Sequence, residues 1–180
     1  VTRLDAGDRL QVLNSVAYPD YQNDFPIMGI DLLWFEKKKK LVAILDFQPL
    51  VQNQEYFETY FDGLKRLKEC FSEFNYDIKS NVYDPNKYFS PWALFCKGGN
   101  FEAKNVLPKV FSSFLKSYWL NLDLFKANSN YIKSNEVSLL HIEYDKYSAE
   151  KDPAHGLFSG FFGKEWSDKY MNEFLFPISL

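Results

Sequence analysis

The sequence contains very few residues of the two types that most often bind metals or form cross-links. It has 2 cysteines and 2 histidines among 180 residues. Cys70 and Cys96 are too few for a disulfide framework and lack metal-ligand spacing, which favours a reducing compartment. His141 and His155 are isolated, and His141 lies on the apolar face of a predicted helix, which is typical of a core residue. The sequence therefore predicts no metal site.

Cofactor motifs and surface-binding patterns are also missing. No G-x-G-x-x-G follows a predicted strand, and the sequence has no P-loop and no C-x-x-C. The formal net charge of -3 argues against nucleic-acid binding, which needs a clustered basic surface. No apolar run approaches the roughly 20 residues that span a bilayer. We therefore expect neither a nucleic-acid nor a membrane partner.

Aromatic residues, in contrast, are abundant. They make up 19% of the chain, with 18 Phe, 12 Tyr and 4 Trp. Part of this excess builds a core, because aromatic side chains bury more area than aliphatic ones. An excess of this size also suits a protein that holds a flat, conjugated ligand. Composition alone favours the core and leaves both interpretations open.

Two neighbouring segments, residues 27–35 and 41–47, are apolar on both faces and are predicted to be adjacent strands. Glu36 and the run Lys37–Lys40 between them indicate a solvated hairpin tip, so the pair is antiparallel. Strands that are apolar on both faces imply a sheet covered on both sides. Further strands are predicted at residues 9–18 and 88–96.

Later segments change to a helical period. Helices are predicted at residues 54–74, 104–125, 136–152 and 164–174, each with apolar residues on one face. The third must end near Asp152, because the residue before Pro153 is pushed out of helical geometry. Strands followed by helices predict an α/β protein, a three-layer α/β/α sandwich with a central antiparallel sheet.

Two aspartates interrupt the apolar strands. Asp31 lies among apolar neighbours in a strand covered on both faces, where desolvation raises the pKa of a carboxyl group and makes it a plausible proton donor. A structural aspartate that accepts backbone hydrogen bonds is an equally good interpretation. Asp46 has the same ambiguity, but its neighbour Gln48 offers a hydrogen-bonding partner. We therefore interpret Asp46 as structural.

Asp152 lies at a helix boundary, where two interpretations predict opposite pKa changes. If it ends the preceding helix, the negative end of the helix dipole raises its pKa and favours acid chemistry. If it caps the next segment, with Pro153 at the first helical position, its pKa falls. The local sequence favours the cap.

The segments that carry these residues resemble the ferredoxin-dependent bilin reductases over almost the whole chain. The resemblance rests on Asn14-Ser-Val-Ala-Tyr-Pro19, Pro26-Ile-Met-Gly-Ile-Asp-Leu-Leu-Trp-Phe35, Leu41-Val-Ala-Ile-Leu-Asp-Phe-Gln-Pro-Leu50, Tyr88-Phe-Ser-Pro-Trp92, Asp152-Pro-Ala-His-Gly-Leu-Phe158 and Asn172-Glu-Phe-Leu-Phe176. The opening residues look most like the branch that makes 15,16-dihydrobiliverdin. Family members carry additional N-terminal structure, so we expect residues 1–180 to be a single bilin reductase domain that lacks N-terminal residues of a longer protein.

The resemblance implies an α/β/α sandwich that binds an open-chain tetrapyrrole between sheet and helices. It also implies no bound metal or flavin, because reduced [2Fe–2S] ferredoxin delivers electrons singly and the bilin passes through radical intermediates while carboxyl groups supply protons. The expected reaction is two-electron reduction of biliverdin IXα at the C15=C16 bridge, in phycoerythrobilin synthesis for photosynthesis. The expected protein is a monomer, located in a cyanobacterial cytoplasm or a plastid stroma.

The family's two acidic residues fall on Asp31 and Asp152, which changes both local interpretations. Asp31 would lie beneath the pyrrole nitrogens and protonate the bilin, and Asp152 would protonate or orient the ring-D side. Asn14 is a substrate-binding position and falls where the phycocyanobilin-forming enzyme has a histidine, which argues against that branch. The run Lys37–Lys40 is a candidate ferredoxin contact, although a solvated hairpin tip is the simpler interpretation.

Two alternatives remain open. Within the class, the protein could reduce 15,16-dihydrobiliverdin to phycoerythrobilin, or perform both steps. From another class, a non-catalytic bilin carrier could keep the fold without turnover. The presence of both Asp31 and Asp152 weighs against a carrier, which could lose either residue without consequence.

Overall fold

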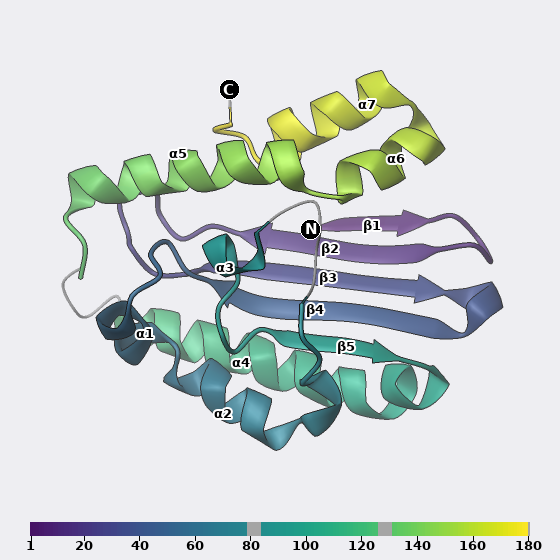
Figure 1. The fold of residues 1–180 in the computed structure, drawn as a ribbon, viewed down its shortest axis with the longest axis horizontal. Coiled ribbons are helices and arrows are strands. Elements are labelled where there is room, and N and C mark those ends of the chain that lie inside the picture. Colours follow the sequence, from purple (N-terminus) through teal and green to yellow (C-terminus); the bar gives the residue numbers. More distant parts are fainter. Residues whose placement is uncertain (79–83, 126–130, 180) are drawn as a thin grey trace.

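A computed structural model describes residues 1–78, 84–125 and 131–179. Within these ranges the strands form one antiparallel sheet whose strands lie in chain order, with β3 at its centre (Figure 1). The strands are β1 (Thr2–Asp5), β2 (Gln11–Ala17), β3 (Ile27–Phe35), β4 (Lys40–Gln48) and β5 (Leu94–Gly98).

The β3–β4 pair has the antiparallel hairpin geometry that its sequence predicts. A short 3-10 turn, η1 (Glu36–Lys38), joins the strands, and Lys39 adopts the left-handed conformation with φ 46°. The tip is solvated, and Lys37 forms an ion pair with Asp8 at 3.1 Å. In the register, Asn14 of β2 lies opposite Asp31 of β3, which lies opposite Ile44 of β4. Directly opposed residues share a face of a sheet, so these side chains point to the same side.

Helices gathered on the β4–β5 side of Figure 1 cover the opposite face of the sheet. They are α1 (Gln54–Tyr60), α2 (Asp62–Cys70) and α4 (Leu107–Phe125), with the 3-10 turn η2 (Ser72–Phe74) and the π-helical η3 (Glu102–Val106). Phe47 of β4 packs against Phe114 and Tyr118 of α4, with ring centroids 5.1 and 5.2 Å apart. All three rings are buried, and this layer holds much of the aromatic core.

The other layer covers the face that carries Asn14 and Asp31. It consists of α3 (Pro85–Tyr88), α5 (Ser134–Lys151), α6 (Ala154–Phe162), α7 (Lys164–Lys169) and the π-helical η4 (Tyr170–Leu175). In Figure 1, α5 runs along the β1–β2 side and α3 lies over β2 and β3. Tyr88 of α3 meets Tyr144 of α5 edge to face, with centroids 5.1 Å apart. The predicted three-layer α/β/α sandwich is therefore confirmed.

Some predicted elements differ from the structure. The strand predicted at residues 88–96 exists but starts too early in the prediction, because Tyr88 belongs to the short helix α3 and β5 begins only at Leu94. That helix forms because the Asp84 side chain accepts a hydrogen bond from the Asn86 N–H at 2.9 Å and Pro85 occupies the first turn. The helix predicted at residues 54–74 breaks at Phe61, whose ψ is 0°. Strand β1 and helix α6 were not predicted.

Candidate active site

A cleft that is open to solvent lies between the sheet and the layer of α3 and α5. The sheet contributes Asn14, Asp31 and Gln48, while Asp152 closes the helical side. Aromatic rings line much of the remaining wall, from Tyr88, Phe89, Tyr144, Tyr147 and Phe176. Flat aromatic walls with a few convergent polar groups are typical of a site for a planar, conjugated ligand. The aromatic residues thus build both the core and this cleft.

Asp31 lies on the floor of the cleft, in the middle of β3. Burial of its carboxyl group raises its pKa to about 7, and repulsion from Asp152 adds to this increase. One hydrogen bond acts in the opposite direction, because the Asn14 amide donates to Oδ1 at 2.5 Å. A carboxyl group with a pKa near 7 is partly protonated at neutral pH and can act as a general acid.

Asn14 is buried beside Asp31, and its amide is used on one side only. Its Nδ2 donates to Asp31, whereas its Oδ1 has no hydrogen-bond partner among the described residues. An unpaired buried acceptor is unfavourable by about 1–3 kcal/mol, so such groups are normally satisfied by a ligand or by water. This unpaired oxygen is itself buried, although Asn14 lines the cleft.

Asp152 combines features of both sequence interpretations. Its backbone N–H donates to the Ser148 carbonyl at 2.9 Å and ends α5, while its carboxylate accepts from the Ala154 N–H at 2.8 Å, as a cap does. Burial nevertheless raises its pKa, against the smaller lowering by the Ala154 hydrogen bond. The pKa decrease expected from the cap is therefore wrong. Asp31 and Asp152 face one cleft as two like-charged groups, each favouring the protonated form of the other.

Asp46 is a structural residue, as the sequence interpretation proposed, but its expected partner is wrong. It is fully buried, and its two carboxylate oxygens accept from the Ser90 N–H at 2.8 Å and the Ser90 hydroxyl at 2.6 Å. Gln48 instead accepts a hydrogen bond from the Tyr144 hydroxyl. Gln48 and Tyr144 both line the cleft and were not predicted as site residues. The one local signal for Gln48 was its position in the strand. Gln48 points to the same face of β4 as Ile44, and Ile44 lies opposite Asp31.

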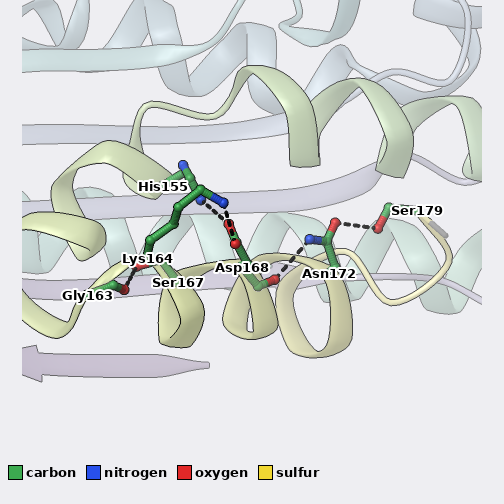
Figure 2. Close-up of polar contacts among 7 residues, drawn as sticks. All are labelled: His155, Gly163, Lys164, Ser167, Asp168, Asn172 and Ser179. Carbon is green, nitrogen blue, oxygen red and sulfur yellow. Dashed lines mark hydrogen bonds and ion pairs between the residues drawn. The ribbon is translucent and has the colours of Figure 1, made fainter.

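The two histidines have separate structural surroundings. His141 is fully buried, as expected for a core residue, with Nε2 3.3 Å from the Asn23 carbonyl. His155 of α6 lies 2.7 Å from Asp168 of α7, which also pairs with Lys164 at 2.6 Å (Figure 2). These contacts link α6 to α7 beyond the turn that carries Asp152.

The described residues include no group of three or more His, Cys, Asp or Glu side chains arranged to hold a metal ion. Within the same ranges, no helix is both long and apolar enough to cross a membrane.

A family model for ferredoxin-dependent bilin reductases matches residues 1–177. The chain belongs to this family. Proteins named 15,16-dihydrobiliverdin:ferredoxin oxidoreductase from Prochlorococcus marinus strains NATL1A and NATL2A are each 83% identical to it over 180 residues, covering 100% of this chain and 76% of theirs. A protein of the same name from Synechococcus sp. strain CC9902 is 59% identical over 99% of this chain and 76% of its own.

A solved structure shares the fold. The crystal structure of tomato phytochromobilin synthase in complex with biliverdin superimposes with a TM-score of 0.80 over 98% of this chain. This chain spans 64% of that protein, and the two are 22% identical in sequence. At this identity, the likeness establishes the fold.

Proposed function

We propose that this protein catalyses the ferredoxin-dependent reduction of biliverdin IXα to 15,16-dihydrobiliverdin, a step toward phycoerythrobilin. Membership of the bilin reductase family and the 83% identity to proteins named for this product support the reaction. The observation that carries the proposal is the cleft in which Asp31 and Asp152 face each other beside aromatic walls. The cyanobacterial origin of these relatives supports a cyanobacterial cytoplasm as the location.

The reaction adds two electrons and two protons across one double bond. Two reduced [2Fe–2S] ferredoxins each supply one electron, and two carboxyl groups each supply one proton. The C15=C16 π bond breaks, and one new C–H bond forms on each carbon. Each added electron makes the bilin more basic, so an acid with a pKa near 7 can transfer its proton to the reduced substrate.

Asp31 is proposed as the first proton donor. Its pKa of about 7 leaves a large protonated fraction at neutral pH, and its position on the cleft floor places it against the face of a planar ligand. Asn14, which also lines the cleft, supports this role because its Nδ2 donates to Asp31 and orients the carboxyl group.

Asp152 is proposed as the second proton donor, on the side of the C15=C16 bridge. Burial raises its pKa, so it also holds a proton more readily than an exposed aspartate. Its backbone position is fixed from both sides, by Ser148 in α5 and by Ala154 at the start of α6. A donor fixed in this way contributes to catalysis by orientation as well as by acidity.

An anaerobic turnover assay tests the reaction. The protein is mixed with biliverdin IXα and a ferredoxin-reducing system, and the products are followed by absorption spectra and chromatography. The proposal predicts loss of the red-absorbing biliverdin band and growth of a shorter-wavelength product that elutes as 15,16-dihydrobiliverdin. Consumption of 15,16-dihydrobiliverdin instead of biliverdin would assign the second step, and tight binding without turnover of either would favour a carrier.

A further inference from the structure

Gln48, the last residue of β4, has a side chain that lies across the backbone of β3. A Cβ atom built on Gly29 would come within 2.7 Å of both Cδ and Oε1 of Gln48. Any larger residue at position 29 would therefore displace this amide. Gly29 and Asp31 lie on the same face of β3, two residues and about 7 Å apart. The Gln48 amide is thus held on the cleft floor, next to the proposed proton donor.

Tyr144 fixes the orientation of the Gln48 amide. The Tyr144 hydroxyl has one proton, which it donates to Oε1 of Gln48. Tyr144 is 2% exposed, so this hydroxyl has little freedom to turn away. With Oε1 engaged, Nε2 becomes the free end of the amide. Among the described residues, Nε2 has no hydrogen-bond partner.

We propose that Gln48 is a substrate-positioning residue whose Nε2 donates a hydrogen bond to a lactam carbonyl oxygen of the open-chain tetrapyrrole. This inference rests on the proposed function. A bilin offers two kinds of acceptor, lactam carbonyls on its end rings and carboxylates on its propionate chains. The floor beside Gly29 lies near Asp31 and Asp152, which repel a carboxylate whenever either is ionised, so the neutral carbonyl is the acceptor that fits.

Two substitutions remove the same hydrogen bond in different ways. Gln48→Met keeps the length of the side chain and removes its donor, whereas Gly29→Ala keeps the glutamine and displaces its amide. Gly29 does not have a positive φ, so its backbone accepts alanine. Each variant should bind biliverdin about tenfold more weakly, as expected for loss of a hydrogen bond to a buried carbonyl. Because both changes act on one contact, the double variant should bind about as weakly as the weaker single variant.

Matched controls separate this contact from general effects. Gln54→Met and Gly160→Ala make the same replacements at exposed positions, where a Cβ on Gly160 meets no atom within 4 Å. Dissociation constants are measured from the bilin absorption change without reductant, and folding of each variant is checked by circular dichroism. Controls that bind like the wild type, with weaker binding by both cleft variants, would support the proposal. Unchanged binding by Gly29→Ala and Gln48→Met would overturn it.

Side-chain amide NMR gives a readout that a merely structural role would not move. The Gln48 NH2 signals are the pair that is missing from the Gln48→Met spectrum. Biliverdin should shift one of these two protons downfield, and bound biliverdin that leaves both in place would overturn the proposal. Wild-type binding that depends on Gln48 without any turnover would contradict the proposed reaction and leave this inference standing. Normal turnover with unshifted Gln48 signals would support the proposed reaction and contradict the role of Gln48. Absence of biliverdin binding would contradict both the reaction and the role of Gln48.

Discussion

Replacing Asp31 with asparagine should stabilise the protein at neutral and alkaline pH. The folded protein raises the pKa of Asp31 from 3.8 to about 7. Since each pKa unit corresponds to about 1.4 kcal/mol, ionised Asp31 destabilises the fold by up to about 4 kcal/mol. The cleft is open to water on one side, which relieves part of this penalty. We therefore expect a gain of about 2 kcal/mol in the free energy of unfolding of Asp31→Asn.

The direction of the pH dependence follows from the raised pKa. Below about pH 4, Asp31 is neutral in both the folded and the unfolded chain, so it imposes no penalty. As the pH rises from about 4 to about 7, the unfolded chain ionises first, and the wild type loses stability relative to the variant. Above about pH 7, the difference in the free energy of unfolding between the variant and the wild type reaches its full value and stays constant. Asparagine keeps the acceptor for the Asn14 amide, so the comparison isolates the charge.

Urea unfolding of both proteins at a series of pH values measures this difference, with Asp8→Asn as control. Asp8 is exposed and pairs with Lys37 at the surface, so its removal should change stability by less than about 0.5 kcal/mol at every pH. An Asp31→Asn curve that runs parallel to the wild type across the whole pH range would refute the raised pKa. A variant that is less stable at about pH 8 would refute it more strongly.

Two further predictions concern the layers that hold the cleft. Ser90→Ala removes the hydroxyl that donates to Asp46 and leaves the buried carboxylate with one hydrogen bond fewer. Chemical denaturation should therefore show a loss of about 1–3 kcal/mol in the free energy of unfolding. A change below about 0.5 kcal/mol would contradict the structural role of Asp46. Phe114→Ala opens a cavity beside Phe47 in the opposite layer and should lower the free energy of unfolding by about 3–5 kcal/mol. Biliverdin affinity measured on the folded Phe114→Ala protein should stay near the wild-type value. A large loss of affinity would indicate that the bilin binds on the α4 side of the sheet and would contradict binding in the cleft.

The central hairpin and the layer order could be predicted from sequence because they depend on local patterns. Residues 27–35 and 41–47 are apolar on both faces, which only a covered sheet accommodates. The strand predicted at residues 88–96 was found only from Leu94 onward. Tyr88 belongs instead to a short helix that the Asp84 cap and Pro85 start, and apolar periodicity does not reveal that helix. Helix α6 was missed because the prediction stopped at Pro153, whereas a proline that ends one helix can also precede the next.

The residues of the candidate site also divide into those that local sequence predicts and those that depend on distant parts of the chain. An aspartate among apolar strand residues marks Asp31 directly, and the resemblance to bilin reductases pairs it with Asp152. Gln48 could not be placed, because its partner Tyr144 lies 96 residues away and belongs to the opposite layer. The Asp46 partner Ser90 is 44 residues distant for the same reason. Local sequence suggested that Asp46 and Gln48 would pair with each other, but tertiary packing gives each a partner from elsewhere in the chain.

The pKa of Asp152 shows why local rules can give the wrong sign. Its contact with the Ala154 N–H is the one that a cap predicts, and by itself it lowers the pKa. The larger effect is burial beneath the cleft wall, which depends on how α5 and α6 pack on the sheet. A sequence pattern cannot supply that quantity.

Anaerobic single turnover of the wild type and Asp31→Asn, measured side by side, tests whether Asp31 donates the first proton. Both proteins are loaded with biliverdin IXα and mixed with reduced ferredoxin, and the absorption spectrum is followed in time. The variant should bind biliverdin but stall at a radical or unprotonated state, while the wild type proceeds to 15,16-dihydrobiliverdin. Product formation by Asp31→Asn at the wild-type rate would contradict the assignment of Asp31 as the proton donor.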